Sequence, residues 1–154
     1  MRAFSVMILL AALLLPSGCA SVSPPIDISA EELQTQAAQG NARAQYSLGS
    51  LYFYGQGVSQ DYATARQWWE KAAAQGHAKA QVSLGMLYVE GQGVPQDYVR
   101  VYMWLNVAAA HLTGDQQKFA AGNRDYVASL MTPAQIAEAQ RLAQQCQAQQ
   151  FKGC

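Results

Sequence analysis

An internal repeat constrains the fold of this chain more strongly than any other feature of its sequence. Residues 42–74 align with residues 78–110 at a spacing of 36 residues, and long runs of positions carry the same residue in both copies. Periods of this length mark stacked supersecondary units, each of which leaves an apolar face that only a neighbouring unit can cover. The sequence therefore predicts a repeat solenoid.

Each copy of the repeat has the pattern of two helices joined by a glycine-rich turn. Leu48 and Tyr52 belong to an apolar stripe at helical spacing in the first half, and Trp68 belongs to a similar stripe in the second half. The turn between them contains the sequence G-Q-G-V in both copies. A glycine inside a helix costs about 1 kcal/mol relative to Ala. Gly49 and Gly85 are therefore expected where a packed neighbour approaches the first helix closely.

The shared pattern A-x-A-x-x-x-L-G-x-L-Y-x-x-G-x-G-V-x-x-D, followed by W and A-A, resembles the Sel1-like repeats, which are relatives of the tetratricopeptide repeats. The resemblance covers repeat 1 at residues 41–76 and repeat 2 at residues 77–112. It implies an all-α fold, a right-handed α/α solenoid of helix-turn-helix repeats. It also implies a module that binds a protein or peptide partner.

Helical segments are expected on both sides of the two repeats. Residues 29–40 resemble a degenerate second helix of a repeat, opened by a capping box of Ser29 and Glu32. Residues 113–154 are expected to form a C-terminal helical cap. Its last helix begins after Thr132, which is followed by Pro at the first helical position and Gln at the third.

The N-terminal residues have the features of an export signal. Residues 1–18 combine a short positive start with an apolar run that is too short to span a bilayer as a stable anchor. Small residues then precede Cys19, and this arrangement resembles a lipoprotein signal in which the cysteine is acylated. Pro16 stands where such signals usually have an aliphatic residue.

Two locations follow from this signal. If Cys19 carries lipid, residues 19–28 form a short tether, and Ala20 in place of Asp resembles lipoproteins sent to the outer membrane. The chain would then face the periplasm and touch the membrane through its N-terminal lipid only. The alternative is ordinary cleavage after Ala20, which would release a soluble periplasmic protein.

Export would place Cys146 and Cys154 in an oxidising compartment. Two cysteines this close to the end of a chain, without further metal ligands beside them, indicate a disulfide. Closing so short a loop would stabilise the fold by roughly 2 to 3 kcal/mol in the chain-entropy model. The alternative is a buried free thiol at Cys146 and a loose thiol at Cys154.

Searches for chemistry along the sequence yield no catalytic residue, metal ligand or cofactor site. Ten basic residues balance ten acidic ones, so no positive field is available to gather nucleic acid. The H-E-x-x-H, G-x-S-x-G and S-x-x-K patterns are missing. Asp61 and Asp97 recur at the starts of helices, where a carboxylate favours the helix dipole. His77 and His111 are expected at helix ends.

A partner-binding surface is predicted from the positions of the first helices that differ between the two copies. Their spacing places them in one stripe beside the shared core stripe, which indicates either a binding groove or packing against the neighbouring repeat. Trp68 and Trp104 are shared and expected in the core, whereas Trp69, replaced by Leu105, is expected nearer the rim. The variable stripe consists of Tyr46, Ser50, Phe53 and Tyr54 in repeat 1 and Val82, Met86, Val89 and Glu90 in repeat 2.

Taken together, these features predict an envelope-associated adaptor that binds a protein or peptide and has no catalysis of its own. One alternative is a hydrolase acting on peptidoglycan or on a β-lactam. Another is a structural lipoprotein that associates with itself. The sequence leaves the oligomeric state and the partner open.

Overall fold

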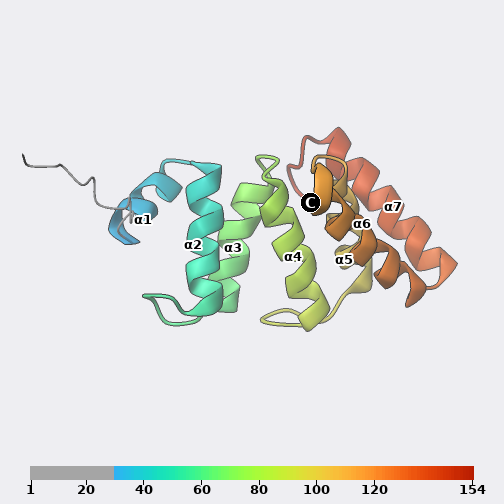
Figure 1. Ribbon diagram of the computed structural model, residues 1–154, viewed down its shortest axis with the longest axis horizontal. Coiled ribbons are helices and arrows are strands. Elements are labelled where there is room, and N and C mark those ends of the chain that lie inside the picture. Colours follow the sequence, from blue (N-terminus) through green and yellow to red (C-terminus); the bar gives the residue numbers. More distant parts are fainter. Residues whose placement is uncertain (1–29) are drawn as a thin grey trace, which may run out of the picture.

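The structure, a computed structural model, describes residues 30–154, so the predicted signal peptide with Cys19, the predicted tether and the predicted Ser29 cap lie outside the described residues. Within this range the chain is all α-helix and turn, which confirms the predicted fold class. The helices follow one another along the long axis from α1 to α5, with α6 and α7 together at the far end (Figure 1). They are α1 (Ala30–Ala38), α2 (Ala42–Tyr54), α3 (Tyr62–Ala73), α4 (Ala78–Glu90), α5 (Tyr98–Ala109), α6 (Gly114–Ser129) and α7 (Pro133–Ala148).

Side-chain and glycine caps fix the boundaries of the first helix of each repeat. The Asn41 side chain accepts a hydrogen bond from the backbone N–H of Ala44 at the start of α2, and His77 caps α4 in the same way. Gly55 and Gly91 end these helices with φ of 67°, a left-handed conformation that glycine adopts without steric cost. The glycine-rich turn therefore stops the first helix and reverses the chain toward the second.

Two apolar clusters hold the helices together. The larger cluster extends from α3 to α7, and within it α5 packs against α4, α6 and α7. The smaller cluster joins α1 to α2 through Ala37, Ala44 and Leu48. The largest fully buried apolar side chains are Leu48, Leu84, Leu87, Val101, Leu105 and Val107.

Trp69 lies in the core, so its predicted place near a rim is wrong. Its side chain is 3% exposed and fits against Gly49, where an added Cβ would lie 2.5 Å from the Trp69 Cδ1 atom. The indole Nε1 also donates a hydrogen bond to the carbonyl of Tyr46 at 3.1 Å. The neighbour expected to approach Gly49 closely is therefore the Trp69 ring. Trp104 is buried as predicted, while Trp68 is only half-buried.

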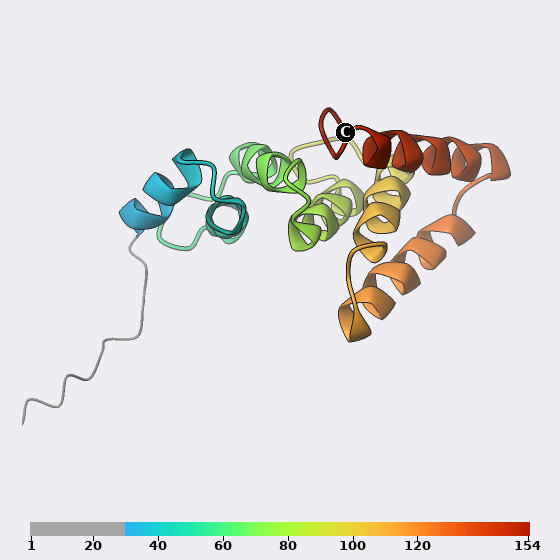
Figure 2. The same cartoon turned by 90° about the horizontal axis from the view of Figure 1, so that it is seen from above.

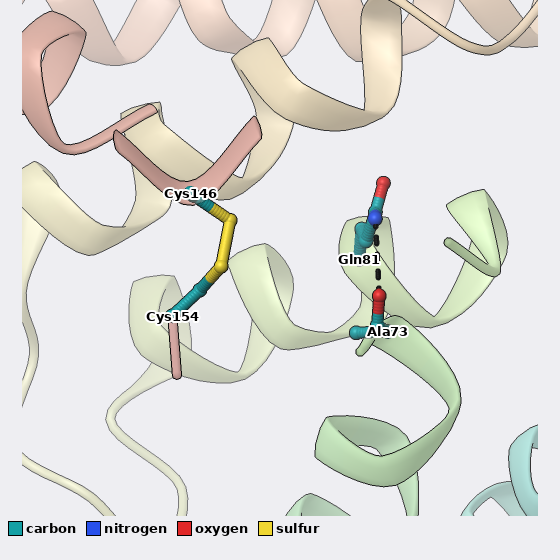
Figure 3. Close-up of a disulfide and its surroundings, with 4 residues drawn as sticks. All are labelled: Ala73, Gln81, Cys146 and Cys154. Carbon is teal, nitrogen blue, oxygen red and sulfur yellow. Dashed lines mark hydrogen bonds between the residues drawn. A yellow bond between two sulfur atoms is a disulfide. The ribbon is translucent and has the colours of Figure 1, made fainter. Parts of the chain in front are cut away.

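Glutamines, two of them buried and Gln117 exposed, tie each first helix to the helix before it. Each amide donates to a carbonyl eight residues earlier, and Figure 3 shows the middle pair. The pairs recur every 36 residues, so α6 begins a third unit in the same register as α2 and α4. They are Gln45 with Ala37 at 3.1 Å, Gln81 with Ala73 at 3.3 Å and Gln117 with Ala109 at 3.2 Å.

The predicted disulfide is present between Cys146 and Cys154, and it closes the tail back onto α7 (Figure 3). Within the closed loop, Phe151 contacts two junctions of the solenoid. Its ring meets the ring of His111 edge-on at 5.2 Å, and an added Cβ at Gly76 would lie 3.2 Å from it. The tail therefore packs over the turn between α3 and α4.

Candidate partner-binding groove

Large apolar side chains are exposed mainly along α6. Of the four that the described residues contain, Tyr54 ends α2, and the other three lie on α6 or directly after it. Phe119 is 54% exposed, Tyr126 is 66% exposed and Leu130 is 49% exposed. Their spacing of seven and four residues places them on one side of the helix. Exposed apolar surface of this kind marks sites of interaction.

A first cavity separates the start of α6 from α4. It has a volume of about 450 Å³ and opens to solvent between the helices. Val82 lines it on α4, Phe119 lines it on α6, and Tyr46 of α2 also belongs to its lining. Its full lining is Tyr46, Lys79, Val82, Ser83, Leu112, Asp115, Gln116 and Phe119.

A second cavity lies farther along the same two helices. It has a volume of about 180 Å³, with Met86 and Val89 on the α4 side and Tyr126 and Leu130 on the α6 side. Leu105 of α5 belongs to its floor and is fully buried. We refer to the two cavities together as the α4–α6 groove. In Figure 2, α6 diverges from α7 at their connecting turn.

The structure divides the predicted variable stripe between two environments. Tyr46 and Val82 line the first cavity, and Met86 and Val89 line the second. Phe53 instead packs inside the first repeat, with its ring centroid 5.1 Å from Trp69 and 5.2 Å from Tyr62. The Ser50 hydroxyl donates to the Tyr46 carbonyl at 3.0 Å. The exposed members Tyr54 and Glu90 end their helices.

The α6 side of the groove was not included in the predicted stripe. Phe119, Tyr126 and Leu130 recur at helical spacing, a pattern that resembles a core face. Ala120 and Val127, on the adjacent face of α6, are buried instead, and Val127 also lines the second cavity. The sequence shows that this helix has several large apolar residues. It does not show which of them face solvent and which face the core.

His77 stands beside the first cavity, next to Tyr46 of its lining. His77 stacks on Tyr46 at a centroid distance of 4.9 Å, and its Nδ1 accepts a hydrogen bond from the Ala80 N–H at 3.3 Å. Burial lowers the pKa of His77, and the charges of Lys79 and Arg43 lower it further. The ring therefore stays neutral at pH 7 and keeps its capping bond.

Polar groups elsewhere in the described chain serve the architecture. The Asp61 carboxylate caps α3 by accepting from Ala63 and Thr64, and the hydrogen bonds from Thr64 lower its pKa. A cavity of about 580 Å³ near the α4–α5 turn contains Arg100, which donates to the Tyr88 hydroxyl at 3.2 Å. Residues 30–154 contain no group of three or more His, Cys, Asp or Glu side chains that could hold a metal ion.

The two repeats match a known protein family. The family described as Sel1 repeat matches residues 42–77 and 78–111. The two matched segments correspond to the two repeats predicted from the sequence. Sel1 repeat proteins generally mediate protein–protein interactions. No curated protein matches the chain at a significant level.

Two solved structures resemble the described helices. One is c5321, a protective antigen present in uropathogenic Escherichia coli that displays an SLR fold, with 36% sequence identity and a TM-score of 0.73. The match covers 79% of this chain and 26% of the antigen, so this chain spans about a quarter of that protein. The other is a Sel1 repeat protein from Oxalobacter formigenes, with 24% identity and a TM-score of 0.52. The match covers 75% of this chain and 96% of the Oxalobacter formigenes protein, and it shows that the two share a fold.

Within residues 30–154, no helix has both the length and the apolar character that crossing a bilayer requires.

Proposed function

We propose that this chain is an envelope-associated adaptor that holds a segment of another protein in the α4–α6 groove. Acyl chains on Cys19 would anchor it at the outer membrane, with the Sel1 repeats facing the periplasm. Support for the binding role comes from the repeats themselves and from the exposed apolar lining of the groove. The proposed anchor rests on the sequence around Cys19.

One observation carries the binding role. Phe119, Tyr126 and Leu130 line two cavities between α6 and α4 and stay exposed, although Ala120 and Val127 of the same helix are buried in the core. Aromatic anchors that border desolvated pockets supply most of the binding energy in protein interfaces. The groove offers two solvent-open pockets in a row that a bound partner would desolvate.

Site-specific photo-crosslinking in the envelope tests this role. A benzophenone amino acid placed at Tyr126 should capture one partner, because its side chain borders the second cavity. The matched control places it at Gln67, which is exposed on α3 and lines none of the groove cavities. Phe119→Ala should abolish the adduct from position 126. Equal adducts from both positions, or none from position 126, would refute the groove as a binding site.

A separate experiment addresses the anchor. Metabolic labelling with palmitate should label the wild-type chain and move it into the detergent phase, because an acylated cysteine carries the lipid. Cys19→Ala should remove both the label and the partitioning. An unlabelled, fully soluble wild-type chain would show that export ends in ordinary cleavage instead.

A further inference from the structure

The charges around the α4–α6 groove are unevenly distributed. Lys79 lines the first cavity, and Arg43 lies close enough to the neighbouring His77 to lower its pKa. Within residues 30–154, neither Lys79 nor Arg43 forms an ion pair. Asp115 is the carboxylate that lines this cavity, and the Lys118 Nζ lies 3.5 Å from its Oδ1.

Helix dipoles add to this positive charge. The N-termini of α2 and α4 lie at the Arg43 and Lys79 end, and neither helix has an acidic residue in its first turn. Their partial positive charges are therefore left without a compensating carboxylate. At the opposite end of α4, Glu90 follows Val89 of the second cavity and is exposed. Lys79 thus lines the first cavity, with Arg43 beyond His77, in a chain whose formal net charge is zero.

The spacing of the cavities limits the shape of an occupant. Apart from the exposed Lys79, the first cavity is lined on α4 by Val82 and Ser83, and the second cavity is lined there by Met86 and Val89. At 1.5 Å of rise per residue, their centres lie roughly 7 Å apart along this helix. Alternate side chains of an extended peptide are separated by roughly the same distance. An extended segment that follows α4 can therefore place residues i and i+2 against the α4 walls of the two cavities.

We propose that the groove binds an extended acidic segment of a partner protein, with an aromatic side chain in the first cavity and an aliphatic side chain in the second. Carboxylates beside the aromatic residue face Lys79. The larger volume of the first cavity, about 450 Å³ against about 180 Å³, assigns the aromatic residue to that end. This inference rests on the proposed binding function and adds the chemistry of the partner.

Titration with two defined peptides tests the inference. The probes are acetyl-Glu-Glu-Phe-Thr-Leu-amide and its analogue with Lys in place of both Glu residues, added to the exported chain carrying Cys19→Ala. Amide chemical shifts should move at Val82, Met86 and Tyr126. The acidic peptide should bind about fivefold more tightly, as expected for one exposed ion pair. High salt should reduce the difference.

A matched pair of charge reversals separates local from net charge. Lys79→Glu should reverse the preference, whereas Lys152→Glu makes the same change in net charge on the exposed tail and should leave it intact. Equal binding of both peptides in the groove would overturn the acidic assignment and leave the adaptor function standing. Shifts outside the groove, or none at millimolar peptide, would overturn the inference, while crosslinking at Tyr126 judges the adaptor function independently.

Discussion

Gly49 and Gly85 occupy the same position in the two repeats but contact different neighbours. An added Cβ would lie 2.5 Å from the Trp69 ring at the first site and 3.2 Å from Leu105 Cγ at the second. Alanine gains about 1 kcal/mol of helix propensity, while overpacking against a rigid ring costs about 1 to 3 kcal/mol. In urea unfolding, Gly85→Ala should be near neutral and Gly49→Ala destabilising by about 1 to 2 kcal/mol. Equal effects would contradict this account.

His77 makes the stability of the fold depend on pH. Its pKa is lowered in the folded state, so between that value and the usual 6.5 the unfolded chain binds more protons. The His77 contribution is therefore complete above the unfolded pKa and declines as pH falls through it toward the lower folded pKa. His77→Asn copies the Asn41 cap without a titrating ring. Between about pH 8 and about pH 5, its melting temperature should fall less than that of the wild type.

The residue types correctly predicted the close packing at Gly49 and Gly85, but they wrongly predicted Trp69 near a rim. The error has a physical reason. A position that differs between repeats was assumed to be exposed, yet Trp69 and its counterpart Leu105 are both buried. Each contacts its own glycine on the preceding helix. Variation between repeats can reflect two solutions to the same packing problem, and a single sequence does not distinguish this from a binding surface.

At the scale of elements, the buried glutamines are equivalent in position but unequal in their bonds. Gln45 donates to Ala37 and accepts from Gln75 at 2.8 Å. In repeat 2 the position of Gln75 holds His111, and Gln81 Oε1 is buried without a hydrogen-bond partner among the described residues. An unpaired buried oxygen costs about 1 to 3 kcal/mol.

Replacement of each glutamine by Met should expose this difference. Gln45→Met removes two hydrogen bonds and should destabilise by about 1 to 2 kcal/mol. Gln81→Met removes one hydrogen bond together with the unpaired oxygen, so the loss and the gain offset each other and the change should be nearly neutral. Urea unfolding of the two variants gives the comparison. A larger loss for Gln81→Met would mean that its single bond to Ala73 dominates.

The C-terminal tail combines a covalent constraint with local strain. Gln150 and Phe151 have φ of 53° and 66°, conformations that cost non-glycine residues about 1 kcal/mol or more each. Removing the disulfide releases this strain, so Cys154→Ser should destabilise by about 1 kcal/mol rather than by the roughly 2 to 3 kcal/mol of the entropy term alone. Thermal unfolding of the variant and of the oxidised wild type measures this loss of stability. A loss of the full entropy term would show that the tail keeps its conformation without the bond.

The third unit of the solenoid shows where sequence pattern fails at this scale. Residues 113–154 were predicted as a helical cap, and α6 and α7 are helices, but α6 also continues the repeat register through Gln117 and Ala109. The L-G-x-L-Y pattern is absent there, so one amide–carbonyl pair carries the whole signal. Two isolated residues in register do not stand out from chance in a sequence.

For the whole molecule, the sequence predicted one wall of the groove and missed the other. The α4 wall follows from comparison of two copies, because Val82, Met86 and Val89 differ from their counterparts. The α6 wall has no second copy for comparison. Its direction depends on how α6 packs on α5, which buries Ala120 and Val127 and leaves Phe119 outward.

Scaffold and binding surface should therefore respond differently to mutation although they share the same helices. Leu84 is fully buried, and Leu84→Ala should cost about 2 to 5 kcal/mol, a large share of the stability of a small domain. Phe119→Ala removes a ring that is already half exposed, so its melting temperature should stay within a few degrees of wild type. Phe53→Ala cannot separate binding from stability, because the Phe53 ring packs on Trp69 in the core.

The decisive measurement pairs thermal unfolding with crosslinking from position 126. Loss of the adduct in Leu84→Ala would follow from unfolding, whereas its loss in folded Phe119→Ala can only come from the groove surface. Tyr54→Ala serves as the exposed aromatic control, because Tyr54 is 65% exposed and lines neither cavity. It should leave both the melting temperature and the adduct unchanged. If Phe119→Ala unfolds the domain as severely as Leu84→Ala does, α6 is held in place by that ring, and the groove is part of the core.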